Sequence, residues 1–173
     1  CHEDKSDAWA YDALQAWGVN SHFKDLNLAK ARYSADRGDL RALPTLQSLI
    51  ADDSQSNLMR ASIIEQLGNL GSRQLPSAAA MLLRSDSPVL RASAVRALRS
   101  VEPVQRYLML RPFIKDTNLS VRMEVAQLLA GIPASELRLQ DIADLEPLFE
   151  EYLAVQSDHL DMPSVQLQVA NFW

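Results

Sequence analysis

The chain has 173 residues, of which 47% are hydrophobic, and it carries 17 Lys and Arg residues against 22 Asp and Glu residues. This composition excludes a disordered polypeptide and is sufficient for one domain-sized core. Leu and Ala contribute 49 residues, whereas the β-branched Val, Ile and Thr contribute only 18, so helix formers dominate. We therefore predict an all-α fold.

The single cysteine excludes an internal disulfide framework and a Cys-rich metal site, and we expect no bound metal. No apolar run approaches the roughly 20 residues that cross a bilayer, so we expect no membrane span. The polar first residues do not form a signal-peptide core. Because the chain starts at Cys1 rather than at Met, we interpret it as a piece of a longer precursor.

Charge is distributed unevenly along the chain. The net charge is −3 in residues 1–59, +6 in residues 60–122 and −8 in residues 123–173. A basic centre is one feature of nucleic-acid-binding proteins. Here the arginines are spread at helical spacing without aromatic clusters, and the acidic flanks would repel a polyanion. We therefore predict no nucleic-acid binding.

An internal repeat covers the middle of the chain. The segments 60–62, 91–93 and 122–124 each begin with Arg and start 31 residues apart. A constant period of this length indicates a repeat protein. Each Arg follows a polar break that contains an aspartate, and it opens an apolar stripe at helical spacing. We predict that each unit ends in an amphipathic helix.

Each unit also has an earlier helical stretch, at 43–51, 75–83 and 104–114. We predict two helices per unit. Ser87 and Glu102, each followed by Pro, have the pattern of an N-cap. Three further prolines lie early or midway in the first helices, which therefore begin or kink there: Pro44, Pro76 and Pro112. Three glycines follow apolar stripes, where a left-handed helix end is favoured: Gly68, Gly71 and Gly131.

A degenerate fourth unit is predicted near the end of the chain. The segment 161–170 parallels the start of a second helix, with Gln166 in the position of the repeated Arg. Its distance from Arg122 exceeds the period, which predicts an insertion within 134–144.

The pattern of Asp, a short turn, an apolar-Arg-Ala sequence and an Ala- and Leu-rich helix resembles the short HEAT repeats, a type also found in phycobilin lyase-like proteins. The resemblance covers 39–131. It implies a right-handed α-solenoid of stacked antiparallel helix pairs, with about ten helices in all. We predict N-terminal helices in 1–38, three repeats in 39–131 and the fourth unit in 132–173.

The start of the chain carries a second resemblance. Cys1 and His2, followed by Trp9 and Trp17, resemble the segment that begins at the last CxxCH haem motif of bacterial multihaem c-type cytochromes of the tetratricopeptide-repeat family. This implies a bacterial, periplasmic parent protein in which haem c is possible, and a repeat array after 165–173. We expect no cofactor in the present chain. Cys1 could instead be a lipidated N-terminus or a free thiol.

By analogy with HEAT repeats, we expect the repeated arginines to lie near the turn of their own unit. There they would bond main-chain carbonyls or the aspartate of the preceding turn, a structural role that suits the several donors of a guanidinium. The arginines are Arg60, Arg91 and Arg122, and the candidate partners are Asp53, Asp86 and Asp116.

A binding surface is predicted on the polar face of the second helices. Residues two and five positions after each Arg share a face, and the opposite face is apolar core. These residues should line a concave column whose mixed charge suits a protein partner better than a polyanion. They are Ser62, Glu65, Ser93, Arg96, Glu124 and Gln127.

The remaining polar and aromatic residues have structural interpretations. His22 and His159 have no second ligand at metal-binding spacing, so we expect surface or cap roles. We expect core or end-cap packing for Trp9 and Trp17. Three acids at 146, 150 and 151 suggest a solvated helix face rather than acid–base catalysis.

Two classes of function remain. The first is a non-catalytic helical scaffold that binds another protein or a neighbouring domain, for which stacked repeats offer a long concave face. The alternative is a chromophore-handling or lyase-like enzyme, which would need a tetrapyrrole-sized pocket with converging polar groups. The sequence contains no such constellation, and we favour the scaffold, of unknown oligomeric state.

Overall fold

The computed structural model describes residues 4–17, 26–170 and 172. Within these residues it contains ten α-helices, four short 3₁₀-helices and no strand. The predicted all-α fold is therefore confirmed. The α-helices are α1 (Asp7–Ala16), α2 (Leu26–Asp36), α3 (Leu43–Ala51), α4 (Asn57–Asn69), α5 (Leu75–Leu82), α6 (Pro88–Ala97), α7 (Pro103–Leu110), α8 (Leu119–Ala130), α9 (Leu139–Ser157) and α10 (Pro163–Ala170), and the 3₁₀-helices are η2 (Leu40–Ala42), η3 (Leu98–Ser100), η4 (Arg111–Phe113) and η5 (Ala134–Glu136).

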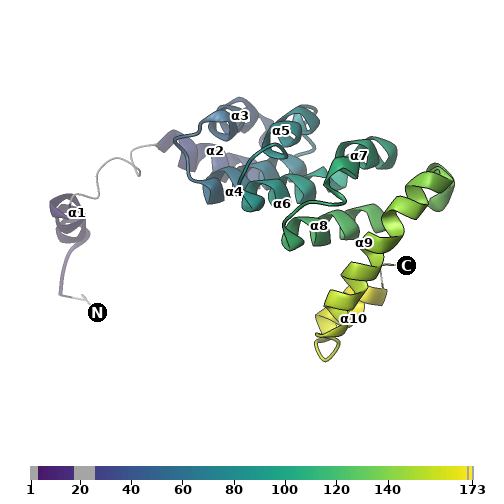
Figure 1. Cartoon of the computed structure of the whole chain (residues 1–173). Helices are drawn as coiled ribbons and strands as arrows, with labels where there is room; N and C mark the ends of the chain where they lie inside the picture. The colour runs from purple at the N-terminus through teal and green to yellow at the C-terminus, as the bar shows by residue number, and fades with distance from the viewer. Residues whose placement is uncertain (1–3, 18–25, 171, 173) are drawn as a thin grey trace.

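The helices stack as pairs in two rows (Figure 1). The first helices α3, α5 and α7 form one row, and the second helices α4, α6 and α8 form the other. In the second row, α4 packs on α6, α6 on α8, and α8 on α9. We call this second row the inner row, because α9 and α10 project on its side of the stack. The predicted α-solenoid of stacked helix pairs is confirmed.

The apolar stripes of the second helices form the core. Ile63, Ile64 and Leu67 of α4 are completely buried, and the equivalent positions of α6 and α8 are buried in the same way. Burying one such Leu or Ile side chain contributes about 1.5–3 kcal/mol. Because each stripe packs against the next helix of the row as well as against the first helix of its own pair, contacts between adjacent units contribute to the free energy of folding.

Proline and acidic caps determine where the first helices begin. Pro44, Pro76 and Pro103 lie in the first turn of α3, α5 and α7, where the missing N–H leaves no helical bond unmade. Glu102 is the best-formed of the predicted caps, since its carboxylate accepts from the N–H groups of Val104 and Gln105. Ser87 occupies the N-cap of α6 but forms no side-chain cap bond. Pro112, predicted within a helix, lies in η4 after α7 has ended.

The three predicted helix-ending glycines have different roles. Gly71 has φ 62° and is left-handed, as predicted. Gly131 has φ −77°, so the prediction of a left-handed residue is wrong there. Gly68 lies inside α4, and a Cβ at this position would meet the carbonyl oxygen of Ala97 at 2.8 Å. Gly68 therefore permits the close approach of α4 to the end of α6.

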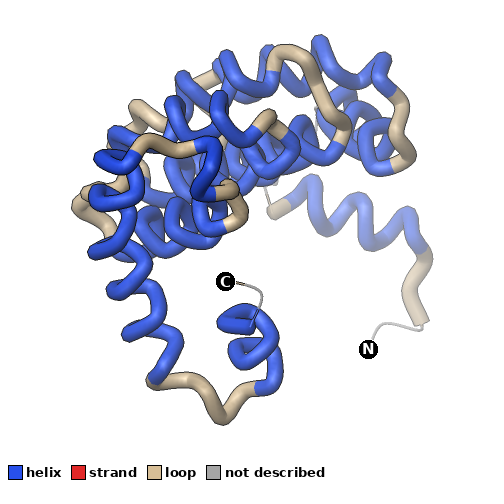
Figure 2. Tube along the Cα trace, turned by 90° about the vertical axis from the view of Figure 1, so that its right-hand side faces the viewer, coloured by secondary structure: helices blue, strands red, loops and turns tan. Residues whose placement is uncertain are grey.

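The last helix pair departs from the others in length. α9 has 19 residues, whereas α7 has eight. The extra residues of the fourth unit thus lie in two places, in the predicted insertion around η5 and in the longer α9. Figure 2 shows α9 leaving the stack and the chain turning back into α10. Phe172 stacks on Tyr152 with ring centroids 4.4 Å apart, and it meets Phe149 edge-on at 5.2 Å, so the end of the chain packs on α9.

The two tryptophans of the N-terminal region differ in their exposure. Trp17 is 75% exposed, so its expected core or end-cap packing is wrong. Trp9 is 40% exposed, and the ammonium group of Lys5 lies 5.9 Å from its ring centroid. α2 packs on α3 and α4, so the stacked part begins before the predicted boundary at residue 39. Among the described residues, no helix has the length and hydropathy needed to cross a membrane.

Candidate functional site

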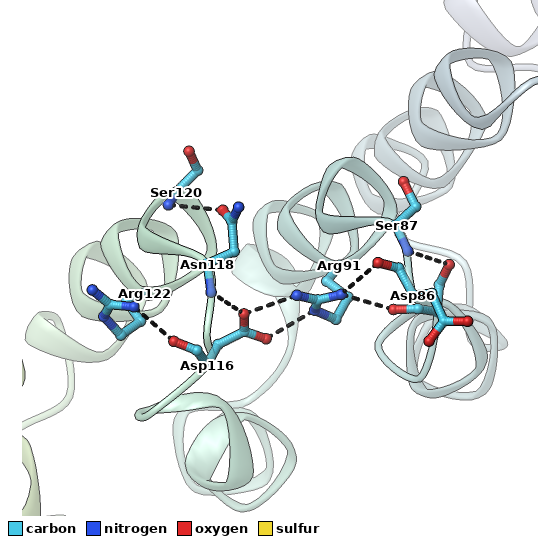
Figure 3. A network of polar contacts seen from close by, with 8 residues as sticks. Asp86, Ser87, Arg91, Asp116, Asn118, Ser120 and Arg122 are labelled. Carbon is cyan, nitrogen blue, oxygen red and sulfur yellow. Dashed lines mark hydrogen bonds and ion pairs between the residues drawn. The ribbon is translucent and has the colours of Figure 1, made fainter.

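The repeated arginines bond the turns between helices, Arg91 and Arg122 also link successive units, and Arg91 has the most partners (Figure 3). Its Nε and Nη2 donate to the two carboxylate oxygens of Asp116 at 2.8 and 2.9 Å. Its Nη1 donates to the carbonyls of Ser85 and Asp86 at 2.9 and 3.1 Å. The side chains of Arg91 and Asp116 are only 12% and 7% exposed, so this is a buried, bidentate ion pair between two units.

The other two arginines make related contacts. Nη1 of Arg122 donates to the carbonyl of Asp116 at 2.7 Å, and its Nε donates to Glu151 of α9 at 2.8 Å. Arg60 donates to the carbonyl of Ile50 at 2.8 Å and pairs with Asp53 at 2.7 Å. Asp53 is 90% exposed, so this pair stabilises the fold much less than the Arg91 pair.

The carboxylate pairing differs from the one predicted. Asp86 offers Arg91 its main-chain carbonyl, and the partner carboxylate comes from Asp116 in the following unit. Asp116 in turn accepts from Arg122 through its main-chain carbonyl. Its carboxylate accepts from Arg91 and, at 2.8 Å, from the N–H of Asn118. The predicted carbonyl bonds are confirmed for all three arginines, including those to Asp86 and Asp116, whereas only Arg60 pairs with the carboxylate of the aspartate in its own unit.

Gln166 in α10 takes the place of the repeated Arg in the fourth unit. Its Nε2 donates to the carbonyl of Leu160, six residues earlier, at 2.7 Å. Arg91 and Arg122 also donate to a carbonyl six residues earlier. The side-chain amide of Gln166 thus makes the turn bond that the guanidinium groups make in the second and third units.

These contacts shift the pKa values of the acids involved. Burial would raise the pKa of Asp116, but the hydrogen bonds from Arg91 and from the N–H of Asn118 outweigh it, and the pKa lies below its ordinary value. Hydrogen bonds from Arg122 lower the pKa of Glu151. Both carboxylates are therefore ionised at neutral pH and act as structural charges rather than as proton donors.

The predicted concave column is largely occupied by contacts between units. Arg96 donates to Glu65 of α4 and Glu124 of α8 at 2.8 and 2.6 Å, and to Ser93 at 2.8 Å. Ser93 is 2% exposed and cannot line a surface. Ser62 accepts from Arg32 of α2 at 2.6 Å.

Ser93 is therefore removed from the predicted column, and Glu65, Arg96 and Glu124 form an inter-unit network at its partly exposed surface, while Gln127 is exposed. The charges of this network neutralise one another across α4, α6 and α8, which ties the units of the inner row together.

The bonds between α2 and α4 were not predicted. Arg32 also reaches Gln66, whose Nε2 donates to Asp36 at 2.6 Å. The 31-residue period, extended upstream, aligns residues 29–36 with 60–67. That alignment is the signal that places α2 in the inner row.

An open apolar groove lies where α8, η5 and α9 meet. It has a volume of about 400 Å³, and its floor is formed by the buried side chains of Leu129, Ile132 and Leu145. Glu146 and Glu150 lie on its rim and are exposed. Sequence reasoning missed this groove, because it requires three elements to converge on the extended α9. Glu151, predicted with them as a solvated face, pairs instead with Arg122.

Metal ligands and haem residues do not assemble in the described part of the chain. No group of three or more His, Cys, Asp or Glu side chains there is placed to hold a metal ion. His159 is exposed in the turn between α9 and α10. Cys1, His2 and His22 lie outside the described residues.

Comparison with known families agrees with the repeat geometry. A family model of HEAT repeats matches residues 11–99, just over half of the chain. The matched range includes Arg60 and Arg91, two of the arginines that carry the 31-residue period. No curated protein and no solved structure matches the chain.

Proposed function

The chain belongs to the HEAT-repeat family, and we propose that it is a non-catalytic helical scaffold that binds another protein. The observation that carries this proposal is the open apolar groove between α8 and α9. The inner row supports it: Arg96 and the turn arginines tie successive units into one body. A rigid row that ends in an apolar groove suits binding, because little conformational entropy is lost when the partner docks.

A photo-reactive residue tests the scaffold function. Ile142 on the groove rim is 37% exposed, and Met81 on the opposite row is 41% exposed, so the two positions are matched in character and access. Each is replaced in turn by a photo-cross-linking amino acid in the parent protein, in its own cells. We expect a discrete cross-linked polypeptide from position 142 and none from position 81. Cross-linking from neither position, or from both equally, would contradict the proposal.

We further propose that the parent is a multihaem cytochrome-like protein of the bacterial periplasm, with tetratricopeptide repeats after this chain. The support is the resemblance of residues 1–18 to the region of a last CxxCH haem motif. The test is the gene itself. The proposal requires a Cys codon three positions before Cys1, with covalent haem in the purified parent. A lipoprotein signal ending directly before Cys1 would overturn it.

A further inference from the structure

The outer surface of α9 has two parallel rows of side chains that face the groove. Leu145, Phe149 and Leu153 form one row, four residues apart, with Leu145 buried at the floor and Phe149 and Leu153 partly exposed. Ile142, Glu146 and Glu150 form the second row at the same spacing, nearer to solvent. The stripe from 142 to 153 is about 17 Å long at 1.5 Å per residue. A partner helix of three turns has the same length.

The acids of α9 divide into two sets. Asp141 pairs with Arg138, Asp144 with Arg111, and Glu151 with Arg122. Glu146 and Glu150 have no ion-pair partner among the described residues, and both line the groove. Three acids of α9 are thus neutralised within the chain, whereas the two beside the groove are exposed and carry unpaired charge among the described residues.

We propose that the groove binds an amphipathic helix of a separate polypeptide, with an apolar face and flanking Lys or Arg side chains. This assignment rests on the scaffold function proposed above and names the chemistry of its partner. The apolar face of the partner covers Ile142, Phe149 and Leu153 above the buried Leu145, and its basic residues meet Glu146 and Glu150. Helix-in-groove binding of this kind uses apolar anchors three and four residues apart.

Charge argues against a second copy of this chain as the occupant. The chain has a net charge of −5, and residues 123–173 around the groove carry nine acids and one base. The excess arginines of residues 60–122 include Arg91, Arg96 and Arg122, which are already paired with acids of the chain. A second copy, with its net charge of −5, is attracted to an acidic groove less strongly than a basic helix is.

The test uses two designed, fluorescein-labelled peptides of 14 residues, about the length that covers the groove. They share one leucine face, and one has Lys where the other has Glu. Binding to the 173-residue chain is followed by fluorescence anisotropy. The charge variant is Glu146→Gln with Glu150→Gln. Its control, Asp158→Asn with Asp161→Asn, removes the same charge from exposed positions beyond α9.

We expect the lysine peptide to bind and the glutamate peptide to bind at least about tenfold more weakly. The variant at 146 and 150 should weaken the lysine peptide about tenfold, as two partly exposed ion pairs would. The control pair should change its affinity less than about twofold. Ile142→Ser, on the exposed rim, should weaken both peptides because it removes apolar contact without touching the core.

Equal binding of the two peptides, or an equal effect of the two charge variants, would overturn the assignment. A concentration-dependent dimer abolished by Ile142→Ser would identify a second copy as the occupant and overturn it as well. In either case a cross-link from position 142 in the parent protein would leave the scaffold function standing. Absence of a cross-link from position 142 would contradict the proposed scaffold function as well.

Discussion

Replacement of Arg91 by Ala should destabilise the chain more than replacement of any exposed charge. The side chain makes four hydrogen bonds, two to Asp116 and two to main-chain carbonyls. Removing one partner of a buried ion pair costs about 3–5 kcal/mol, because the other charge stays buried. Asp116 keeps the N–H of Asn118, so we place the loss near the lower end, at about 3 kcal/mol.

The free energy of unfolding is measured by urea titration, followed by far-ultraviolet circular dichroism. For a domain of this size, a loss of about 3 kcal/mol lowers the melting temperature by about 6–12 °C. Arg91→Lys should lie between Ala and the unmodified chain, since Lys keeps the charge but not the planar set of donors. Asp53→Ala is the control: its carboxylate is 90% exposed, and its loss should cost less than about 0.5 kcal/mol.

The stability loss should also be local. Because each unit contacts only its neighbours, hydrogen exchange should accelerate in α6 and α8 before it does in α3. The reasoning is refuted if Arg91→Ala costs less than about 1 kcal/mol, or no more than Asp53→Ala.

Three further outcomes are expected. Folding lowers the pKa of Asp116, so its contribution to the free energy of unfolding is complete above the unfolded pKa of about 4 and is lost as the pH falls through the folded pKa. The urea midpoint of Asp116→Asn should therefore fall less steeply in acid than that of the unmodified chain. Arg96→Ala should cost about 1 kcal/mol, and a double-mutant cycle with Glu124→Ala should show coupling of about 0.5 kcal/mol or more, since this half-exposed pair joins α6 to α8. Gly68→Ala should lower the melting temperature despite the higher helix propensity of Ala, because the added Cβ would lie 2.8 Å from the carbonyl oxygen of Ala97.

The helix pairs of the middle units could be predicted because their signals are local. The 31-residue period and the Arg that opens each apolar stripe identify α4, α6 and α8 without any knowledge of tertiary contacts. Proline positions similarly mark the starts of α3, α5 and α7. The Arg and the Pro each act within one turn of their own helix, so the sequence of that turn is sufficient to recognise the helix start.

Contacts between units could not be predicted in the same way. Asp116 reaches Arg91 because of the rotation of one unit relative to the next, which no spacing along the chain specifies. Gly68 resembles a helix end in the sequence, but its role depends on Ala97 of the neighbouring unit. Arg96 likewise has the pattern of a binding face in the sequence, whereas its ion-pair partners lie on two other helices of the chain.

The groove was missed for a related reason. Its apolar residues have the pattern of ordinary core positions, and two of its acids have the pattern of a solvated helix face. The long α9 brings Phe149 and Leu153 to the groove, where both stay partly exposed although Phe172 packs on the ring of Phe149. Element lengths at the end of a repeat array therefore determine which apolar positions are covered.

Hydrogen–deuterium exchange of the chain, alone and saturated with the lysine peptide, tests most directly whether the stacked repeats present the α8–α9 groove as a protein-binding site. We predict slower exchange in α9 (139–157) and in the second half of α8, with exchange in α3, α5 and α6 unchanged. Protection that falls on the first-helix row instead, or an exchange pattern that the peptide leaves unaltered, would contradict this account.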